Sequence, residues 1–334
     1  MKRCAFLIFA AMFFLSAESS NLNLSLTDNI YRTSSKEYDI ELDAEFQGKV
    51  NRERFDLFYN LGLFTPIMNN YMMNLPSDVT FQFVPVDNAD RTLMTGVYSF
   101  ETFYLFQEYL ENNMIAPGIF IDHKEYPNDY LMIKNSIDGR TEKFIFLNEF
   151  SNSKIEASTK WMVGLPIKMS IHLTGFGGYK LNSDNSSVMR WGVTPLLSLN
   201  LFNSLGLSAS FLYSAVAGET LDYYLDDSFL DEYYYSEKDI RGKATILFGE
   251  KAKGIVSGSY SVRDYLPLYH TADADSTVLG TTENRTDSIF ELEVILKLKN
   301  DDFEPYFRYV FTGRNSTNAL YSYNSNSLTF GIEF

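Results

Sequence analysis

Side chains that commonly carry catalysis are few and scattered in this sequence. The 3 histidines, His123, His172 and His270, lack the i, i+4 spacing that places two imidazole rings on one helix face to bind zinc. No G-x-S-x-G turn, phosphate-binding loop or dinucleotide fingerprint occurs. His270 is followed by Asp273 and Asp275, a combination common on polar surfaces. We therefore predict that the protein is not an enzyme and uses no catalytic residue, metal or cofactor.

An acidic, tyrosine-rich stretch, residues 218–239, is the other candidate for binding chemistry. Its carboxylates and phenols are Asp222, Asp226, Asp227, Asp231, Glu232, Tyr223, Tyr224, Tyr233, Tyr234 and Tyr235. Such carboxylates can bind calcium, and such tyrosines can contact a protein partner. Their spacing matches no calcium loop, so a specific role for this stretch remains an alternative to an ordinary solvated surface.

Composition excludes several classes of protein. The 334 residues include 28 Lys and Arg against 43 Asp and Glu, a formal charge of −15. Because binding to nucleic-acid phosphates needs clustered basic side chains, we expect no nucleic-acid partner. An aromatic content of 16% is too high for a disordered chain. Only one long apolar run occurs, at the start of the chain, which excludes a protein with many membrane helices.

The first residues, 1–17, have the order of a secretory signal peptide. A basic start, an apolar run over residues 5–15 and small residues next to the expected cleavage site near Ala17 follow one another. The run is too short to cross a bilayer as a helix. The only cysteine, Cys4, would leave with this segment. We therefore expect an exported, cysteine-free domain over 18–334 that is held together without disulfides.

From about residue 154 onward, apolar and polar residues alternate with the period of a β-strand, in segments of about ten residues. Three of the apolar faces are Ile155, Ala157, Thr159, Trp161 and Val163; Phe290, Leu292, Val294, Leu296 and Leu298; and Leu328, Phe330, Ile332 and Phe334. Segments 36–47 and 53–64 alternate in the same way. This pattern predicts strands with one apolar and one polar face.

The predicted connections alternate between short and long. Tight turns are expected at 164–166, 203–204, 250–253 and 300–302, and longer polar stretches at 181–187, 217–238, 266–286 and 314–324. Short turns at one rim and long loops at the other are typical of β-barrels that span the bacterial outer membrane. A soluble β-sandwich gives no reason for such alternation.

Because of these strands, the signal peptide and the last residues, the chain resembles a bacterial outer-membrane β-barrel of the porin-like type. Leu328, Phe330, Ile332 and Phe334 match the apolar alternation and terminal aromatic residue that end such barrels. The resemblance implies an integral outer-membrane location, contact with membrane lipid, and recognition of these four residues by the barrel-assembly machinery. It identifies no particular family.

Counting strands back from the carboxy terminus predicts an all-β, antiparallel up-and-down barrel of about 14 strands, with 12 or 16 as alternatives. The count includes a hairpin over residues 130–150, whose turn is placed at the Asp138-Gly139 pair. Pro195 interrupts one predicted strand, and because proline cannot donate to the ladder we expect a bulge or bend there.

The same count leaves residues 65–128 as one long excursion. Helical spacing over 101–112 is consistent with a segment that folds into the lumen as a plug or caps the barrel from outside. Alternatively, residues 79–84 and 92–104 are two further strands, which would raise the count to 16.

If the apolar face contacts lipid, the polar face lines the lumen and carries two charged walls. The acidic wall consists of Asp39, Glu41, Asp43 and Glu45. The basic wall consists of Lys160, Lys168, Arg190, Arg241, Lys243 and Arg263, with His172 beside them. In a barrel of about 14 strands the second strand lies opposite the ninth, so the walls would face each other and create a transverse field. The alternative is that lumen charges pair with neighbours, as predicted for Glu293 and Arg308.

These features predict a porin-like channel, monomeric or trimeric, through which small hydrophilic solutes diffuse. One alternative is a plugged barrel that acts as a surface adhesin or receptor through long outward stretches, residues 65–128, 217–238 and 266–286. A second alternative is a secreted, soluble all-β protein. The solute itself is not indicated by the sequence.

Overall fold

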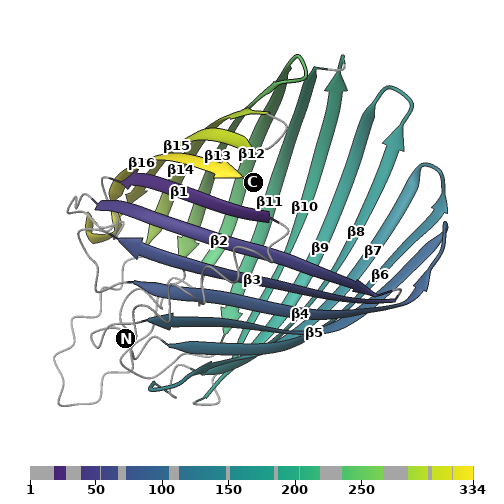
Figure 1. The fold of residues 1–334 in the computed structure, drawn as a ribbon, viewed down its shortest axis with the longest axis horizontal. Helices are drawn as coiled ribbons and strands as arrows, with labels where there is room; N and C mark the ends of the chain where they lie inside the picture. Colours follow the sequence, from purple (N-terminus) through teal and green to yellow (C-terminus); the bar gives the residue numbers. More distant parts are fainter. Residues whose placement is uncertain are drawn as a thin grey trace.

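The computed structural model forms a single closed barrel of 16 strands, in which each strand pairs with its neighbours in the sequence and β1 closes the ring against β16 (Figure 1). Every pairing is antiparallel. The structure describes residues 19–27, 39–52, 54–66, 73–104, 113–147, 151–183, 187–202, 204–218, 235–265, 285–299, 303–317 and 319–333. Residues 1–17 and Phe334 lie outside these ranges.

The strands of the first half of the ring are β1 (Ser19–Thr27), β2 (Asp39–Arg52), β3 (Phe55–Pro66), β4 (Asn74–Asp87), β5 (Arg91–Tyr104), β6 (Met114–Asn128), β7 (Leu131–Phe144) and β8 (Asn152–Leu165). Those of the second half are β9 (Met169–Asn182), β10 (Ser187–Leu201), β11 (Leu205–Gly218), β12 (Tyr235–Phe248), β13 (Ala252–Tyr265), β14 (Thr286–Leu298), β15 (Glu304–Ser316) and β16 (Tyr323–Glu333). A 3-10 turn, η4 (Ala319–Tyr321), precedes the last strand.

Large apolar side chains cover the outer face of the barrel instead of a central core. Ile119, Val97 and Met189 are 63%, 53% and 56% exposed, and each alternates along its strand with inward side chains. The closed ring pairs each strand on both sides, so no sheet edge is left with unpaired backbone groups. In a lipid environment a barrel needs an apolar outer face and strands whose backbone groups are hydrogen-bonded to neighbouring strands. This barrel has both features.

The two rims differ in the way that the sequence predicts. At one rim, called the turn rim, short connections join the strands, for example residues 88–90, 129–130 and 166–168. The opposite rim, called the loop rim, has the longer connections, including those over 219–234 and 266–284, which fall outside the described residues. Two non-glycine residues at the turn rim, Lys168 and Phe202, have positive φ angles of 55° and 59°, as tight turns require.

The predicted count of about 14 strands is two lower than the observed 16, and residues 65–128 are not a long excursion. This segment contains β4, β5 and β6, which are regular members of the barrel. The alternative count of 16 is confirmed, and its two extra strands at 79–84 and 92–104 lie within β4 and β5. β6 is a third strand in this segment, and the predicted hairpin over 130–150 supplies one strand, β7, instead of two. The predicted helix over 101–112 is contradicted at its start, where β5 continues to Tyr104, and its remainder lies outside the described residues.

The predicted hairpin turn at Asp138-Gly139 is also wrong. β7 passes straight through this pair, and the true turn lies at residues 129–130. Asp138 pairs with Phe120 and Glu156 on the two sides, and its Oδ1 accepts a 2.8 Å hydrogen bond from the hydroxyl of Tyr98. The long-range ladder on both sides thus overrides the local turn preference of an Asp-Gly pair.

Pro195 produces a gap in pairing without a bulge. β10 pairs with β11 in one register, from Val193 with Tyr213 to Leu196 with Ser210, and only the two intervening pairs are absent. On its other side Pro195 remains opposite Leu173 of β9. The register shifts that do occur lie beside turns, between Phe83 and Val86 and between Glu125 and Asn128.

None of the helical structure in the described ranges is long and apolar enough to cross a membrane.

Candidate functional site: the walls of the lumen

The acidic wall lies on β2, and the strand register places its side chains on the inward face. Glu41, Asp43 and Glu45 pair with Ser25, Asn23 and Asn21 of β1, whereas the intervening Leu42 is on the outer face with Leu24. Asp39 has the same parity opposite Thr27, and its side chain lies outside the described residues.

The acidic wall continues beyond β2, which the sequence did not predict. Asn60 of β3 donates a 2.6 Å hydrogen bond to Oε1 of Glu45, and Asp78 of β4 lies opposite Asn60 in the ladder. Asp56 also faces inward and pairs with Lys49 at 3.8 Å. Since β4 was assigned to an excursion, sequence reasoning could not place Asp78 on this wall.

The basic wall occupies β8 to β13 on the same inward face. Lys160 and His172 project from β8 and β9, Arg190 from β10, Arg241 and Lys243 from β12, and Arg263 from β13. Lys168 differs from the prediction, because it lies in the turn between β8 and β9. All the predicted basic residues thus share one side of the ring.

The two walls face each other across the barrel. In a closed ring of 16 strands, β10 lies halfway around from β2 (Figure 1). The predicted ninth strand corresponds to β11, so the strand opposite β2 is one strand earlier in the sequence than predicted. The opposition itself is retained: β2 is centred against the strands that carry the basic residues.

Some lumen charges are neutralised by neighbours, as the alternative interpretation predicts. Arg263 pairs with Glu237 at 3.1 Å, and Arg241 pairs with Asp239. The predicted pair is confirmed as well: Nε of Arg308 donates to Oε1 of Glu293 at 2.8 Å.

Two members of the basic wall have no such partner. Within the described ranges neither Lys160 nor Lys243 has a carboxylate within ion-pair distance, and Arg190 instead lies over the ring of Phe176 at 5.3 Å. The basic wall therefore keeps net positive charge toward the lumen.

A buried ion cluster at the loop rim was not predicted. Asp287 has a fully buried side chain and accepts hydrogen bonds from both Arg285, at 2.7 Å, and Arg314. The guanidinium of Arg285 lies 3.4 Å from the ring centre of Tyr321 in η4. These residues fell in or next to predicted loops, so their sequence positions gave no sign that they would meet.

Aromatic rings line the inward face between the walls, on strands that the sequence assigned to the excursion. Tyr98 of β5 and Phe120 of β6 lie with ring centres 6.4 Å apart. Each covers a glycine on the neighbouring strand: a Cβ at Gly118 would lie 2.3 Å from Cζ of Tyr98, and one at Gly96 would lie 2.5 Å from Phe120. Glycine is required at both positions because any side chain would collide with these rings.

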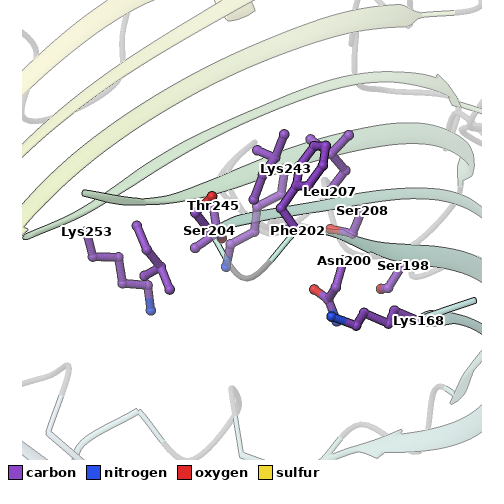
Figure 2. A pocket seen from close by; sticks show the side chains of 13 residues that line it. Lys168, Ser198, Asn200, Phe202, Ser204, Leu207, Ser208, Lys243, Thr245 and Lys253 are labelled. Carbon is purple, nitrogen blue, oxygen red and sulfur yellow. The ribbon is translucent and has the colours of Figure 1, made fainter. Parts of the chain in front are cut away.

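A cavity of about 690 Å³ lies in the wall at the turn rim, between β9 and β13 (Figure 2). It is called the rim pocket here. Its charged lining residues are Lys168, Lys243 and Lys253, and its polar lining residues are Ser198, Asn200, Ser204, Ser208 and Thr245. Lys253 was assigned to a tight turn, but it lies on β13 with an inward side chain, opposite Leu247.

Two of the three histidines form side-chain hydrogen bonds with polar neighbours. Nε2 of His172 lies 2.9 Å from the hydroxyl of Ser170, and Nε of Arg91 donates to Nε2 of His123 at 2.9 Å. His270 lies outside the described residues. No group of three or more His, Cys, Asp or Glu residues suited to a metal occurs in the ranges that the structure describes.

The predicted assembly residues lie on the last strand. Leu328, Phe330 and Ile332 share the outer face of β16, and Phe330 is 53% exposed there and packs edge-on against Phe307 at 5.3 Å. Phe334 falls outside the described ranges.

Comparisons with known proteins give a fold but no family. No protein-family profile and no curated protein sequence matches the chain. Its structure is similar to OccAB3 from Acinetobacter baumannii, with a TM-score of 0.58, 9% identity, and coverage of 95% of this chain and 98% of that chain.

A bacterial polysaccharide outer membrane secretin matches with a TM-score of 0.56, 11% identity, and coverage of 95% and 97%. Pseudomonas aeruginosa OccD3 matches with a TM-score of 0.52, 11% identity, and coverage of 95% and 90%. The chain thus has the fold of bacterial outer-membrane β-barrel proteins.

Proposed function

We propose that this protein is a porin-like channel of the outer membrane through which small hydrophilic solutes diffuse, without a cofactor or a chemical step. The observation that carries the proposal is a closed ring of 16 strands whose inward face is polar and charged. Barrels of about 16 strands are wide enough to leave an aqueous lumen, whereas barrels of about eight are filled by their own side chains.

The composition of the inward face supports passage of polar solutes. Between the charged residues, β10, β11 and β13 present partly exposed hydroxyl groups on the inward face, namely Ser198, Ser208, Ser210, Ser257 and Ser259. Hydroxyls exchange hydrogen bonds with water and with solutes at little energetic difference. Such a surface would favour diffusion over tight capture of apolar ligands.

The opposed walls supply the proposed selectivity. Carboxylates on β2 and ammonium or guanidinium groups on β8 to β13 lie on opposite sides of the ring. Between walls of low dielectric such an arrangement creates a field across the lumen that orients water and dipolar solutes. Local ion pairs reduce this field, and the carboxylates of β2 together with Lys160 and Lys243 would maintain it.

The proposal places the barrel in the outer membrane after cleavage of residues 1–17, with lipid around its apolar face. We infer that the barrel-assembly machinery inserts it and that it works as a monomer or trimer. One protein of similar fold is described as a bacterial polysaccharide outer membrane secretin. That likeness is consistent with transit through the lumen, while the solute of this chain remains to be identified.

Liposome swelling tests the proposal directly. Liposomes that contain the refolded protein should swell in isotonic arabinose and much more slowly in isotonic raffinose, because diffusion through a pore falls steeply with solute size. Protein-free liposomes should swell in neither sugar. Swelling rates equal to those of protein-free liposomes, from vesicles shown to contain folded barrel, would contradict an open channel and favour the adhesin or receptor alternative.

A further inference from the structure

The rim pocket gathers three lysines, from one turn and two strands, around one cavity. Lys168 lies in the turn between β8 and β9, Lys243 on β12 and Lys253 at the start of β13. Figure 2 shows the three side chains extending from the wall toward the same open space. No carboxylate belongs to the pocket lining.

This arrangement raises the free energy of the empty pocket. Like charges that share a cavity repel one another, and the solvent around these exposed lysines reduces that repulsion without removing it. In the part of the chain that the structure describes, Lys243 and Lys253 have no carboxylate partner, in contrast to the nearby Lys297, whose Nζ lies 2.6 Å from Oε1 of Glu333. An anion in the pocket would relieve the repulsion.

The walls of the pocket are fixed by the backbone. The amide of Asn200 donates to the carbonyl of Lys168 at 3.0 Å, and the amide of Leu247 donates to the carbonyl of Ser204 at 2.8 Å. These bonds join three adjacent hairpins at the turn rim. The space they enclose therefore exists before a ligand arrives, which lowers the entropy lost on binding.

A glycine lies among the polar groups of the pocket. A Cβ at Gly206 would lie 3.2 Å from Oδ1 of Asn200 and 3.9 Å from Cβ of Thr245, within the space between the pocket's polar groups. The cavity volume, about 690 Å³, falls in the range of small-molecule sites. Hydroxyl and amide groups around it can donate hydrogen bonds to oxygen atoms of a ligand.

We propose that the rim pocket binds small polyanionic solutes through their phosphate or carboxylate oxygens, with Lys243 and Lys253 as the main charge contacts. The proposal rests on the proposed channel function and deepens it, because it names the class of solute that pauses at the turn rim. Ammonium groups act as point charges for such oxyanions, and hydroxyl groups complete their coordination.

Isothermal titration calorimetry on the full barrel in a nonionic detergent tests the pocket without requiring conductance. Inorganic pyrophosphate and succinate are the two probes, one for phosphate and one for carboxylate oxygens. We expect at least one probe to bind, and its affinity to fall with added sodium chloride because the contacts are charged. The probe that binds more tightly identifies the oxyanion.

The decisive variant is the double substitution Lys243→Gln with Lys253→Gln, which should weaken binding by about tenfold to a hundredfold, because two charge-assisted contacts are lost and each corresponds to a factor of about ten at most. The control is Lys251→Gln, which removes one positive charge from the turn of the same hairpin, at a residue that does not line the pocket. Its affinity should equal that of the wild type. The pair Lys243→Arg with Lys253→Arg keeps both charges and should retain most of the binding.

Equal affinity of the wild type and the double glutamine variant, or absence of binding by both probes, would overturn the proposal. Heat-modifiable migration of each variant on gels confirms that the barrel is folded in every titration. Failure of the channel function gives a different pattern: liposomes would fail to swell while calorimetry still detected the lysine-dependent site.

Discussion

Asp287 shows how strongly the effect of one charge depends on its surroundings in this barrel. Its buried carboxylate lies between Arg285 and Arg314, whose side chains are only 15% and 11% exposed. By contrast, Glu293 and Arg308 form a pair in which the side chains are 29% and 48% exposed. A buried cation left without its partner is far more unfavourable than an exposed one, because water cannot replace the lost contact.

We therefore expect Asp287→Asn to lower the free energy of unfolding by about 3 to 5 kcal/mol. The control Glu293→Gln should lower it by at most about 1 kcal/mol. Urea titration of the refolded barrel, followed by fluorescence of its 2 tryptophans, measures both values. Equal losses in the two variants would show that the Asp287 cluster does not stabilise the loop rim.

The acidic wall gives the second prediction at this scale. Neutralising Asp39, Glu41, Asp43 and Glu45 together, by the corresponding amides, should shift ion selectivity toward anions because the basic wall would then dominate the lumen potential. The reversal potential in a salt gradient measures the shift.

The matched control neutralises four acidic residues of the same charge in the stretch between β11 and β12, namely Asp222, Asp226, Asp227 and Asp231. We expect it to change selectivity much less. Selectivity that stays unchanged in the β2 variant would exclude these carboxylates from the conducting path.

At the residue scale, the sequence was a good guide to which face a side chain occupies and a poor guide to its partners. Strand parity correctly predicted that Glu41 and Lys243 face the same side of the sheet as the other polar residues. The meeting of Asp287 with Arg314 depends on the register of β14 with β15, and local spacing does not set that register. Lys253 was missed because the turn before it ends at residue 251, two residues earlier than expected.

In strand β7 the local preference of an Asp-Gly pair for a turn is opposed by pairing with two neighbouring strands. Asp-Gly pairs favour two-residue hairpin turns, yet here the pair is in the middle of a strand that is hydrogen-bonded on both sides. Ile137 is 48% exposed on the outer face, and Asp138 faces inward to Tyr98. Both neighbours of β7 in the ring pair with Asp138 and with Gly139, which outweighs one favourable turn.

Single cysteines test this placement. The sequence holds only Cys4, within the predicted signal peptide, so the exported chain provides no background thiol. In lipid vesicles, Asp138→Cys should react with a water-soluble maleimide through the lumen, whereas Ile137→Cys should be protected by lipid. Equal rapid labelling of both positions would indicate an exposed turn and contradict a continuous β7.

β4 and β5, which the sequence indicated only as an alternative, have weak patterns for a shared physical reason. β4 contains Pro76, and its outer face is interrupted by Ser77, which pairs with Glu101 of β5. Alternation is therefore weak in both strands near the loop rim. In a barrel each strand is stabilised by two neighbours, so a segment with a weak pattern of its own can still complete the ring. The strong patterns of β8, β14 and β16 were recognised because their apolar faces are uninterrupted.

At the scale of the whole molecule, closure of the ring depends on the contact between its first and last strands. β1 pairs with β16 over residues 21–27 and 327–333, and the hydroxyls of Ser25 and Thr329 lie 2.8 Å apart across this seam. The hydroxyl of Tyr306 on β15 also donates to Oδ1 of Asn23 at 2.6 Å. These contacts join residues near the two ends of the sequence, so the barrel closes only when the last strand is present.

The resemblance to outer-membrane barrels predicts a separate role for the terminal residue in assembly. Deletion of Phe334 should reduce the amount of folded barrel in the outer membrane several-fold in cells, because the assembly machinery would no longer recognise the chain. Refolding of the same variant from urea into detergent should be nearly normal. Equal losses in cells and in detergent would assign Phe334 to stability instead of recognition.

The measurement that tests the central claim most directly is the single-channel conductance of residues 18–334, refolded in detergent and added to a planar bilayer. We predict discrete, long-lived current steps that vary linearly with voltage, because a ring of 16 strands with a polar inward face would hold a continuous water path. Silence from protein shown to have inserted would contradict an open lumen and would indicate a closed barrel that acts through its long loops.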